Sequence, residues 1–315
     1  MKILIFGAGA IGTTYAWQIH EAGHDVSLFV RKQRMVRYSH SGVPITYTDM
    51  RKGVEDIGHS VFRPKSTDRL EPGKPYDLII VCVRSKQLND TIPFIAKNSG
   101  NAHILFLGNM WDELRHAEKL FPKGRFFLGF PGVISGSSVE NGINCYLFRN
   151  KNTIIGEPDG KITERLQQAA EVFEEAGLQP QLSSRITDVL QHEYLRAAIL
   201  PGLISKAGNA SLFASNKLLI KQYVLALKEG MKVCKKRGAQ APGIFPFNRM
   251  WLPGFALTYL LQQSLRDESL AALDAQQKHA VDEKKKMYFD VLKTARKEKI
   301  PAPYWSSFEK YMDFS

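Results

Sequence analysis

Hydrophobic residues fall in short runs through the first half of the chain and recur with helical spacing through the second. Apolar runs that predict strands fall at residues 3–6, 26–30, 77–83 and 103–107, and the run at 77–83 is continuous, as expected of a strand buried on both faces of a parallel sheet. Segments with helical spacing separate them, at about residues 87–97 and 114–120. Strands that alternate with helices predict a doubly wound α/β sheet.

The first 32 residues form one complete unit of strand, turn, helix and strand. The turn has the pattern GxGxxG and consists of Gly7, Ala8, Gly9, Ala10, Ile11 and Gly12. The first glycine allows the tight turn, the second lets the backbone approach a pyrophosphate, and the third lets the helix lie close to the strand. Phosphates would bind at the helix N-terminus. We predict a dinucleotide site; a purely structural glycine turn is the alternative.

The residues after the second strand indicate which dinucleotide binds. An NAD site usually has an acidic residue here for the ribose 2′-hydroxyl, whereas an arginine accommodates a 2′-phosphate. This chain has Arg31, Lys32 and Arg34 and no carboxylate. NADP(H) is therefore the predicted cofactor, with Arg31 as the principal contact. A solvated basic loop is the other interpretation of the same residues.

The pattern changes after residue 125 and again after residue 184. Runs at 126–130, 132–134, 144–148 and 153–155 follow one another without helices and predict antiparallel strands that extend the sheet. A helix at 162–176 follows. Beyond 184 only helical patterns remain, at 186–205, 218–236, 255–273, 279–299 and 305–312. We therefore expect a Rossmann NADP-binding domain over residues 1–184 and an all-helical substrate and dimerisation domain over 185–315. Residues 33–75 are polar, with short strands expected at 44–48 and 61–63.

Composition excludes several classes of protein. The 315 residues are 44% hydrophobic and 23% charged, as in ordinary globular proteins. The net charge of +12 could suggest nucleic acid, but the basic residues at 228–237 and 284–299 are mixed with acidic ones on helices. Solvated helix faces explain that mixture better than a binding stripe, and we expect no nucleic-acid partner. A positive net charge also attracts small anionic ligands.

Targeting and metal-binding signals are not evident in the sequence. Cys82, Cys145 and Cys234 are far apart and form no metal-ligand pattern, so we expect neither structural disulfides nor a metal. The chain begins without a signal-peptide pattern, and no apolar run reaches the ~18 residues of a membrane span. The expectation is a cytoplasmic protein without a membrane partner.

Two strand ends are the places to look for catalytic groups, because ligands of such sheets bind at the carboxyl ends of strands. Arg84, Ser85, Lys86 and Gln87 follow the strand that ends at Val83, and Gly108 and Asn109 follow the strand that ends at Leu107. With a helical second domain, the nicotinamide is expected in an interdomain cleft.

In these features the chain resembles the ketopantoate reductase family of NADPH-dependent 2-dehydropantoate 2-reductases. The shared features are GAGAIG, Arg31, a basic residue and Gln after a strand, an Asn-Gly-like turn, and the Ile-Pro-Ala-Pro turn at 300–303. The resemblance implies a 6-phosphogluconate-dehydrogenase-like helical domain, a 2-oxo acid substrate and a place in pantothenate biosynthesis. A homodimer stays open.

The same resemblance assigns roles to three further residues. Arg84 stands where the family has a lysine near substrate and cofactor, and keeps the charge without the ability to donate a proton. Asn109 belongs to an inverted Asn-Gly pair and is expected to contact cofactor or substrate. Glu283 falls on the family's cleft glutamate, although it could equally belong to the charged helix face at 282–286.

The proton donor is where the chain departs from the family. Ala197 occupies the place of the family's acid lysine, and Pro201 and Ser205 replace two asparagines. Lys206, His192 and Lys86 are other candidate donors. Lys206, however, follows Ala197 by about two and a half helical turns and so lies on the opposite face, and His192 is more typical of a satisfied helix histidine. Arg196 could anchor a carboxylate or form an ordinary ion pair.

These observations predict an NADPH-dependent oxidoreductase that reduces ketopantoate or a related 2-oxo acid. A catalytically silent NADP(H)-binding or sensing protein of the same fold is the second hypothesis, and a helix-rich partner-binding module is the third. The aromatic residues Phe247, Trp251 and Phe255 are expected in the core rather than in a substrate pocket.

Overall fold

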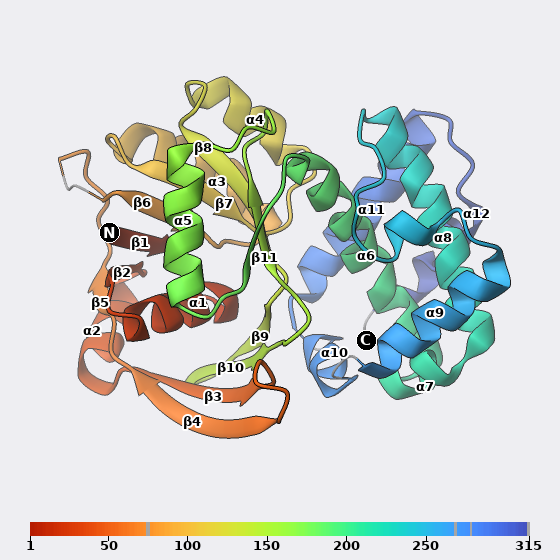
Figure 1. The fold of residues 1–315 in the computed structure, drawn as a ribbon, viewed down its shortest axis with the longest axis horizontal. Coiled ribbons are helices and arrows are strands. Elements are labelled where there is room, and N and C mark those ends of the chain that lie inside the picture. The colour runs from red at the N-terminus through yellow and green to blue at the C-terminus, as the bar shows by residue number, and fades with distance from the viewer. Residues whose placement is uncertain (74–75, 268–269, 278, 314–315) are drawn as a thin grey trace. The chain divides into compact units, whose positions relative to one another are not determined.

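The computed structural model describes every residue except 74–75, 268–269, 278 and 314–315 (Figure 1). The chain divides into two compact units, Met1–Ile186 and Thr187–Ser315. The first unit is built on β-sheets, whereas helices make up the second. The division falls close to the boundary after residue 184 that the loss of β-pattern suggests.

An eight-stranded sheet forms the centre of the first unit, with the strand order β12-β11-β8-β7-β6-β1-β2-β5. Its strands are β1 (Lys2–Phe6), β2 (Asp25–Phe29), β5 (Lys65–Thr67), β6 (Leu78–Val81), β7 (His103–Leu107), β8 (Phe126–Pro131), β11 (Thr153–Gly156) and β12 (Pro180–Leu182). Neighbouring strands are parallel except β8 and β11. The fold is thus the expected doubly wound α/β sheet.

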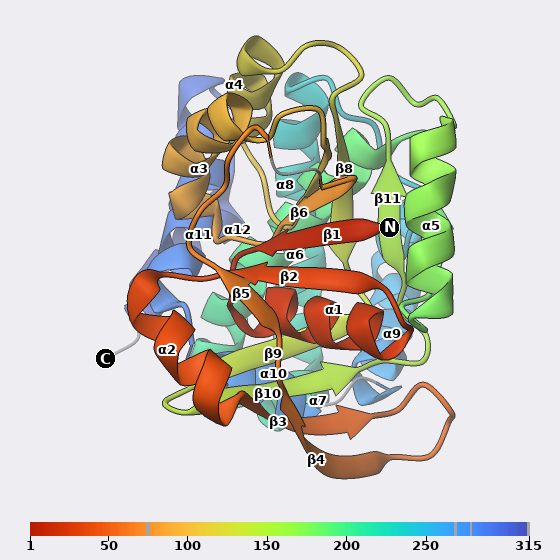
Figure 2. The same ribbon diagram turned by 90° about the vertical axis from the view of Figure 1, so that its left-hand side faces the viewer.

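Helices cover both faces of this sheet (Figure 2). They are α1 (Ala10–Glu21), α2 (Lys32–Ser41), α3 (Ser85–Asn98), α4 (Glu113–Leu120) and α5 (Glu164–Glu175). Alternate residues of β1 point to opposite faces. Ile3 and Ile5 pack in one core with Tyr15 of α1 and Phe173 of α5. Helices α3 and α4 lie on the other face, where Phe106 packs edge-on against Phe121.

A second sheet of four strands, in the order β4-β3-β10-β9, corrects the sequence-based prediction. It contains β3 (Val43–Asp49), β4 (Asp56–Phe62), β9 (Ile134–Val139) and β10 (Gly142–Leu147). The strands expected near 132–148 therefore do not extend the main sheet; only β8 and β11 do. Burial alternates along β10, which is typical of a sheet with one packed face. Helix α2 lies in the segment where only short strands were expected.

The described part of the second unit contains seven α-helices and two short 3₁₀ turns. The helices are α6 (Ile186–Ala207), α7 (Ala210–Ser215), α8 (Lys217–Lys236), α9 (Gly254–Asp267), α10 (Leu270–Gln277), α11 (Val281–Lys297) and α12 (Pro303–Ser307). Among the described residues, the predicted helix at 255–273 covers α9 and the first part of α10. The segment expected to be helical at 305–312 is α12 followed by a 3₁₀ turn at Glu309–Tyr311.

Large aromatic side chains and one carboxylate join the helices of the second unit. Trp305 of α12 is buried, and its indole nitrogen donates to the Ala226 carbonyl of α8 over 2.6 Å. Glu229 of α8 accepts the backbone N–H groups of Tyr304 and Trp305 at 3.2 and 3.1 Å. Burial raises the pKa of Glu229. This carboxylate satisfies N–H groups at the start of α12 that have no partner within the helix.

Three features predicted from composition can be compared with the described residues. Cys82, Cys145 and Cys234 are all free thiols. Within the described ranges, no cluster of His, Cys, Asp and Glu has an arrangement that would hold a metal ion. No helix among those residues combines the length and the apolar character needed to cross a membrane.

Candidate functional site at the carboxyl edge of the sheet

The turn between β1 and α1 needs glycine at two positions for steric reasons. Gly7 has a φ of +126°, and a Cβ there would lie 2.6 Å from the Cys82 carbonyl oxygen. A Cβ at Gly12 would lie 2.0 Å from the Gly7 carbonyl oxygen. At Gly9, by contrast, a Cβ would meet nothing within 4 Å. Gly7 and Gly12 therefore hold the scaffold together, whereas the glycine at position 9 leaves space above the turn.

Substitution of Gly12 by alanine tests the scaffold role. Alanine usually stabilises a helix relative to glycine, but here its methyl group collides with backbone that cannot move independently. We expect a loss of roughly 3 kcal/mol in the free energy of unfolding, measured by urea denaturation. Gly254→Ala at the start of α9, where a Cβ meets nothing within 4 Å, is the matched control. Equal stability of the two variants would contradict this assignment.

The N-terminus of α1 is suited to an anion. The helix begins after Gly9 with no side-chain cap and no acidic residue in its first turn. In the first hydrogen bond of the helix backbone, the Thr13 N–H donates to the Gly9 carbonyl at 2.9 Å. The N–H groups of Ala10, Ile11 and Gly12 consequently have no partner within the helix and point along the positive end of its dipole. A phosphate group at this place would satisfy them.

Basic residues follow β2 at the same edge of the sheet. Arg31 is exposed and is the N-cap residue of α2, without a side-chain capping bond. Arg34 reaches back, and its Nη1 donates to the Ala8 carbonyl over 3.3 Å. A cation at the N-terminus of a helix opposes the helix dipole, so these positions are unfavourable for α2 itself. Together they make an electropositive border beside the glycine turn.

Arg84 and Gln87 begin α3 after the end of β6. The backbone N–H of Arg84 donates to Oε1 of Gln87 over 3.3 Å, and the N–H of Gln87 donates to the Arg84 carbonyl over 2.8 Å. Gln87 therefore caps α3 and fixes the backbone that carries Arg84. The Arg84 residue is exposed at this edge.

Asn109 lies in the loop that follows β7. Gly108 has a φ of +151° and its N–H donates to the Gly129 carbonyl at 3.0 Å, while Glu113 accepts the Trp111 N–H at 2.8 Å. These bonds hold both ends of the loop. Within the described part of the chain, the Oδ1 atom of Asn109 is buried and has no hydrogen-bond partner. Such an acceptor is costly unless a ligand or water donates to it.

The sheet brings the predicted residues of the first unit together. The order β7-β6-β1-β2 makes the four strands neighbours, and each ends at the same edge of the sheet. Gly7 to Gly12, Arg31, Arg84 and Asn109 all follow these strand ends. Glu283 belongs to the second unit, where it is half-buried in the first turn of α11.

Glu283 shares a face of α11 with Lys286 and Asp290, since these residues are three and seven positions apart. Asp290 accepts from the hydroxyl of Tyr194 on α6 at 2.6 Å and from Lys286 at 2.7 Å. Ala197 lies three residues after Tyr194 and shares its face of α6. The helix that carries Ala197 is thus joined to the Glu283 face of α11.

The candidate proton donors predicted on α6 are engaged in packing. His192 is buried, its Nδ1 lies 2.8 Å from the Asp188 carbonyl, and its ring packs edge-on against Phe247. The Lys206 amine donates to Gln222 at 2.9 Å and lies over the rings of Phe308 and Tyr311.

Arg196 and the aromatic residues near α9 were also given expected roles in this unit. Arg196 forms an ion pair with Glu193 at 2.8 Å, which is the ordinary role considered for it. Phe247 is buried as expected, but the expectation of a core position is wrong for Trp251 and Phe255, which are 76% and 81% exposed.

Sequence reasoning missed Lys284, which follows Glu283 in the first turn of α11. Burial lowers the pKa of this lysine to about 8, against the opposing effect of the Glu283 carboxylate. An amine with such a pKa can donate a proton near neutral pH. The only sequence signal for it is its place beside Glu283, because burial is not visible in a run of charged residues.

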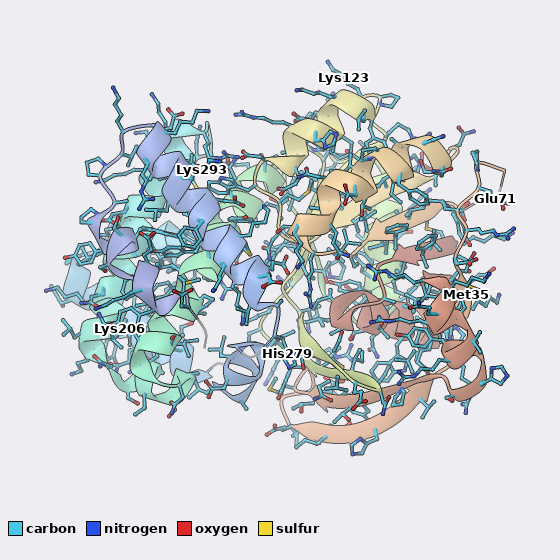
Figure 3. All side chains as sticks on the ribbon, turned by 180° about the vertical axis from the view of Figure 1, so that it is seen from behind. Met35, Glu71, Lys123, Lys206, His279 and Lys293 are labelled. Carbon is cyan, nitrogen blue, oxygen red and sulfur yellow. The ribbon has the colours of Figure 1, made fainter. Side chains whose placement is uncertain are left out.

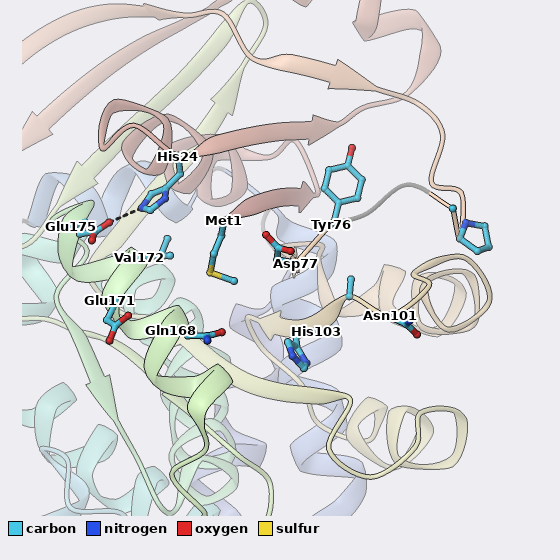
Figure 4. A pocket seen from close by; sticks show the side chains of 13 residues that line it. Met1, His24, Tyr76, Asp77, Asn101, His103, Gln168, Glu171, Val172 and Glu175 are labelled. Atoms are coloured by element: carbon cyan, nitrogen blue, oxygen red, sulfur yellow. Dashed lines mark ion pairs between the residues drawn. The ribbon is translucent and has the colours of Figure 1, made fainter.

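A cavity of about 690 Å³ lies at the opposite, amino edge of the sheet (Figure 4). Two of its charged groups have partners: His24 lies 2.9 Å from Glu175, and Asp77 accepts the Lys2 backbone N–H at 2.7 Å. Burial, with Arg165 and Arg125 nearby, lowers the pKa of His103. Parallel sheets bind nucleotides at the carboxyl edge, so this cavity is separate from the candidate site.

A dinucleotide fits the carboxyl edge on three observations. The uncapped α1 N-terminus suits a pyrophosphate, Gly9 leaves the turn open to it, and Asn109 has a buried acceptor without a partner among the described residues. The basic residues after β2 add positive charge for a further phosphate.

Comparison with known proteins agrees with this geometry. The family described as ketopantoate reductase PanE/ApbA matches residues 3–160. A 2-dehydropantoate 2-reductase of Pyrococcus abyssi is 25% identical over 244 residues, which are 76% of this chain and 76% of that protein. The crystal structure of 2-dehydropantoate 2-reductase from Geobacter metallireducens has a TM-score of 0.75 at 17% identity and covers 99% of both chains.

Another solved structure has the same fold. A D-mandelate dehydrogenase with NADH and anilino(oxo)acetate has a TM-score of 0.76 at 16% identity, covering 99% of this chain and 97% of that one. The match to the family extends over half of the sequence and includes the glycine turn, Arg31, Arg84 and Asn109. With its Rossmann-type sheet and helical second unit, the chain belongs to the ketopantoate reductase family of oxidoreductases.

Proposed function

We propose that this protein uses NADPH to reduce the carbonyl group of a 2-oxo acid, either ketopantoate or a close relative. The observation that carries the proposal is the electropositive edge of the sheet, where an uncapped helix N-terminus and the cations Arg31 and Arg34 surround an open glycine turn. Reduction of ketopantoate would place the protein in pantothenate biosynthesis. Membership of the family supports the type of reaction.

When bound, the reduced nicotinamide supplies a hydride to the carbonyl carbon of the substrate. The carbonyl π bond breaks as this hydride adds, and the oxygen becomes an alkoxide that must receive a proton. Ala10, Ile11 and Gly12 would hold the pyrophosphate through backbone N–H groups. Arg31 and Arg34 would pair with the 2′-phosphate, and the Asn109 side chain would accept a hydrogen bond from cofactor or substrate.

The substrate carboxylate is assigned to Arg84, whose guanidinium stays charged at any working pH and can form two parallel hydrogen bonds. Glu283 is proposed to orient the substrate, in keeping with the family's glutamate. Arg84 cannot deliver the proton, because its guanidinium does not lose a proton at any working pH.

Lys284 is proposed as the proton donor in place of the absent family lysine. It adjoins Glu283, whose face of α11 is joined through Asp290 and Tyr194 to the helix that carries Ala197. Burial lowers the pKa of Lys284 to about 8. Lys286 is less suited, because its amine is already paired with Asp290 at 2.7 Å.

Cofactor choice can be tested with Arg31→Asp. The substitution removes a charge-assisted bond to the 2′-phosphate and adds a repelling carboxylate, so we expect NADPH affinity to fall on the order of 100-fold while NADH affinity is kept or improved. Aspartate is also a better N-cap than arginine, and should stabilise α2 by about 1 kcal/mol. Fluorescence titration and thermal denaturation measure the two effects. Unchanged preference for NADPH over NADH would exclude Arg31 as the determinant.

The overall proposal is tested by NADPH oxidation with ketopantoate beside a panel of other 2-oxo acids. If the protein reduces another 2-oxo acid of the panel but not ketopantoate, the proposed type of reaction holds and ketopantoate is excluded as the substrate. Tight NADPH binding with no turnover of any carbonyl would favour the alternative of a catalytically silent, cofactor-sensing protein. The replacement of the family's lysine by Ala197 supports that alternative.

A further inference from the structure

Strand β4 lies at an edge of the second sheet, where no other strand of the described residues pairs with its outer side (Figure 2). It pairs with β3 along its whole length, from Val43 opposite Phe62 to Asp49 opposite Asp56. On an edge strand, half of the backbone N–H and C=O groups point away from the neighbour, and a further strand can pair with them. The outer side of β4 is therefore a template for strand addition.

The other sheet edges are protected in ways that β4 is not. The main sheet ends in β5 and β12, which are three residues long and begin with Lys65 and Pro180. Short strands, lysine and proline all discourage the addition of a strand. At β9, the opposite edge of the second sheet, Ile134 and Ser135 are buried. The seven residues of β4, in contrast, contain neither lysine nor proline.

Alternate residues of β4 form an exposed face with apolar side chains near its centre and opposite charges at its ends. Ile57 and Val61 are 67% and 47% exposed, and His59 lies exposed between them. Glu55, just before the strand, and Arg63, just after it, continue the same alternation and are also exposed. We call these five residues the β4 face. Its order is acidic, apolar, histidine, apolar and basic, so the face is complementary to itself when the chain direction is reversed.

Antiparallel pairing of β4 with β4 of a second copy, centred on His59, matches this order. Ile57 then lies opposite Val61 of the second copy and Glu55 opposite its Arg63, and a two-fold axis repeats both pairs. A shift of the centre by one residue would place Glu55 opposite Val61 in one direction and Ile57 opposite Arg63 in the other. Because apolar pairs and opposite charges both stabilise neighbouring strands, the sequence favours the register centred on His59.

The side chains near the centre of β4 leave space for a second strand. Gly58 and Ser60, which alternate with the β4 face, are small. The Nδ1 atom of His59 lies 3.2 Å from the Thr46 hydroxyl of β3, so the imidazole leans toward β3 and away from the outer edge. Tyr47 of β3 covers Gly58, where a Cβ would collide with the tyrosine hydroxyl. The inner side of β4 is thus packed, and the outer side is accessible.

We propose that the β4 face is a self-association surface, at which two copies of the chain join their second sheets into one continuous sheet. The surface belongs to the first unit, Met1–Ile186, and is separate from any contact that the helical unit makes. Pairing of one short strand buries less than the ~800 Å² that each partner contributes to a standard interface, so the association is weak and reversible. The Glu55–Arg63 pair occurs twice in each contact, which makes the association sensitive to both charges.

Charge reversal at the two ends of the β4 face tests the pairing. Glu55→Arg places arginine opposite arginine, and Arg63→Glu places glutamate opposite glutamate. Each variant alone should raise the dissociation constant on the order of 10-fold at low salt. An equimolar mixture of the two variants places the arginines of one copy opposite the glutamates of the other, and should associate at least as well as the native protein. Sedimentation equilibrium of the full chain at about 100 μM measures these associations.

Lys119→Glu, at an exposed residue of α4, is the matched control, since it makes the same change of charge away from β4. This variant should associate like the native protein. The proposal is wrong if the two single variants associate as tightly as the native protein, or if their mixture associates no better than either alone. Circular dichroism confirms that each variant is folded.

A cross-link tests the register independently of charge. His59→Cys places two thiols opposite one another at the two-fold axis, where paired Cα atoms lie roughly 4.5–5.5 Å apart, close enough for a disulfide. Mild oxidation should give a disulfide-linked dimer on a non-reducing gel. Ile57→Cys lies on the same exposed face but about 13 Å along the strand from its counterpart, and should give little cross-linked product. Equal cross-linking of the two variants, or none at position 59, would reject the pairing.

These measurements separate the β4 contact from other contacts and from the proposed reaction. A contact elsewhere in the chain would neither require the mixing of oppositely charged variants nor bring position 59 next to its counterpart. The measurements use the protein without NADPH or substrate, so their outcome does not depend on whether the proposed reduction takes place.

Discussion

Replacing Gly9 by alanine is expected to weaken NADPH binding on the order of 100-fold and to leave the melting temperature of the protein unchanged. A Cβ at this position meets no protein atom within 4 Å, so the methyl group costs the fold nothing. It would project into the space that a pyrophosphate needs beside the N–H groups of α1. Isothermal titration with NADPH and a thermal melt measure the two quantities.

Gly243→Ala is the matched control for this experiment. A Cβ at Gly243 would likewise meet nothing within 4 Å, and the residue lies in a loop of the helical unit. Its substitution should change neither NADPH affinity nor stability. If Gly9→Ala binds NADPH as tightly as the native protein, the phosphates do not lie over the glycine turn, and the proposed cofactor site is wrong.

Removal of the Lys284 amine, as in Lys284→Met, is expected to lower kcat by about 10²- to 10⁴-fold, the usual contribution of a general acid. The affinity for NADPH should not change, because the glycine turn and Arg31 are untouched. Steady-state kinetics with the best substrate from the 2-oxo acid panel measures the effect. Lys293→Met, on the exposed side of the same helix, is the control and should retain activity (Figure 3).

The pH dependence separates a proton donor from a lysine that only packs. A donor must be protonated, and the pKa of Lys284 is lowered to about 8. Native kcat should therefore be steady below pH 8 and fall as pH rises beyond it, whereas the residual activity of Lys284→Met should lack that fall. Loss of activity with an unchanged pH profile would indicate a structural role and would return attention to Lys86.

Much of the first unit could be predicted from sequence because its strands are continuous apolar runs. The runs at 3–6 and 103–107 became β1 and β7 with nearly the same bounds. Each is buried on both faces, and such a segment has few other ways to fold. The glycine pattern was equally informative, since the clashes at Gly7 and Gly12 involve backbone atoms of the same sheet edge.

Long-range pairing was the part that sequence reasoning could not determine. The strand at 142–147 was expected in the main sheet, yet β10 pairs in parallel with β3, about a hundred residues earlier in the chain. Register and partner depend on which face is packed, and a local pattern does not contain that choice. The burial of Lys284 and the exposure of Phe255 depend in the same way on tertiary packing.

The arginine that begins α2 occupies a place where the helix itself would favour aspartate. If Arg31 selects the 2′-phosphate as proposed, nucleotide preference is uncoupled from the architecture that presents the nucleotide. A lineage of this family could then exchange one coenzyme for the other at that single position and gain helix stability in doing so.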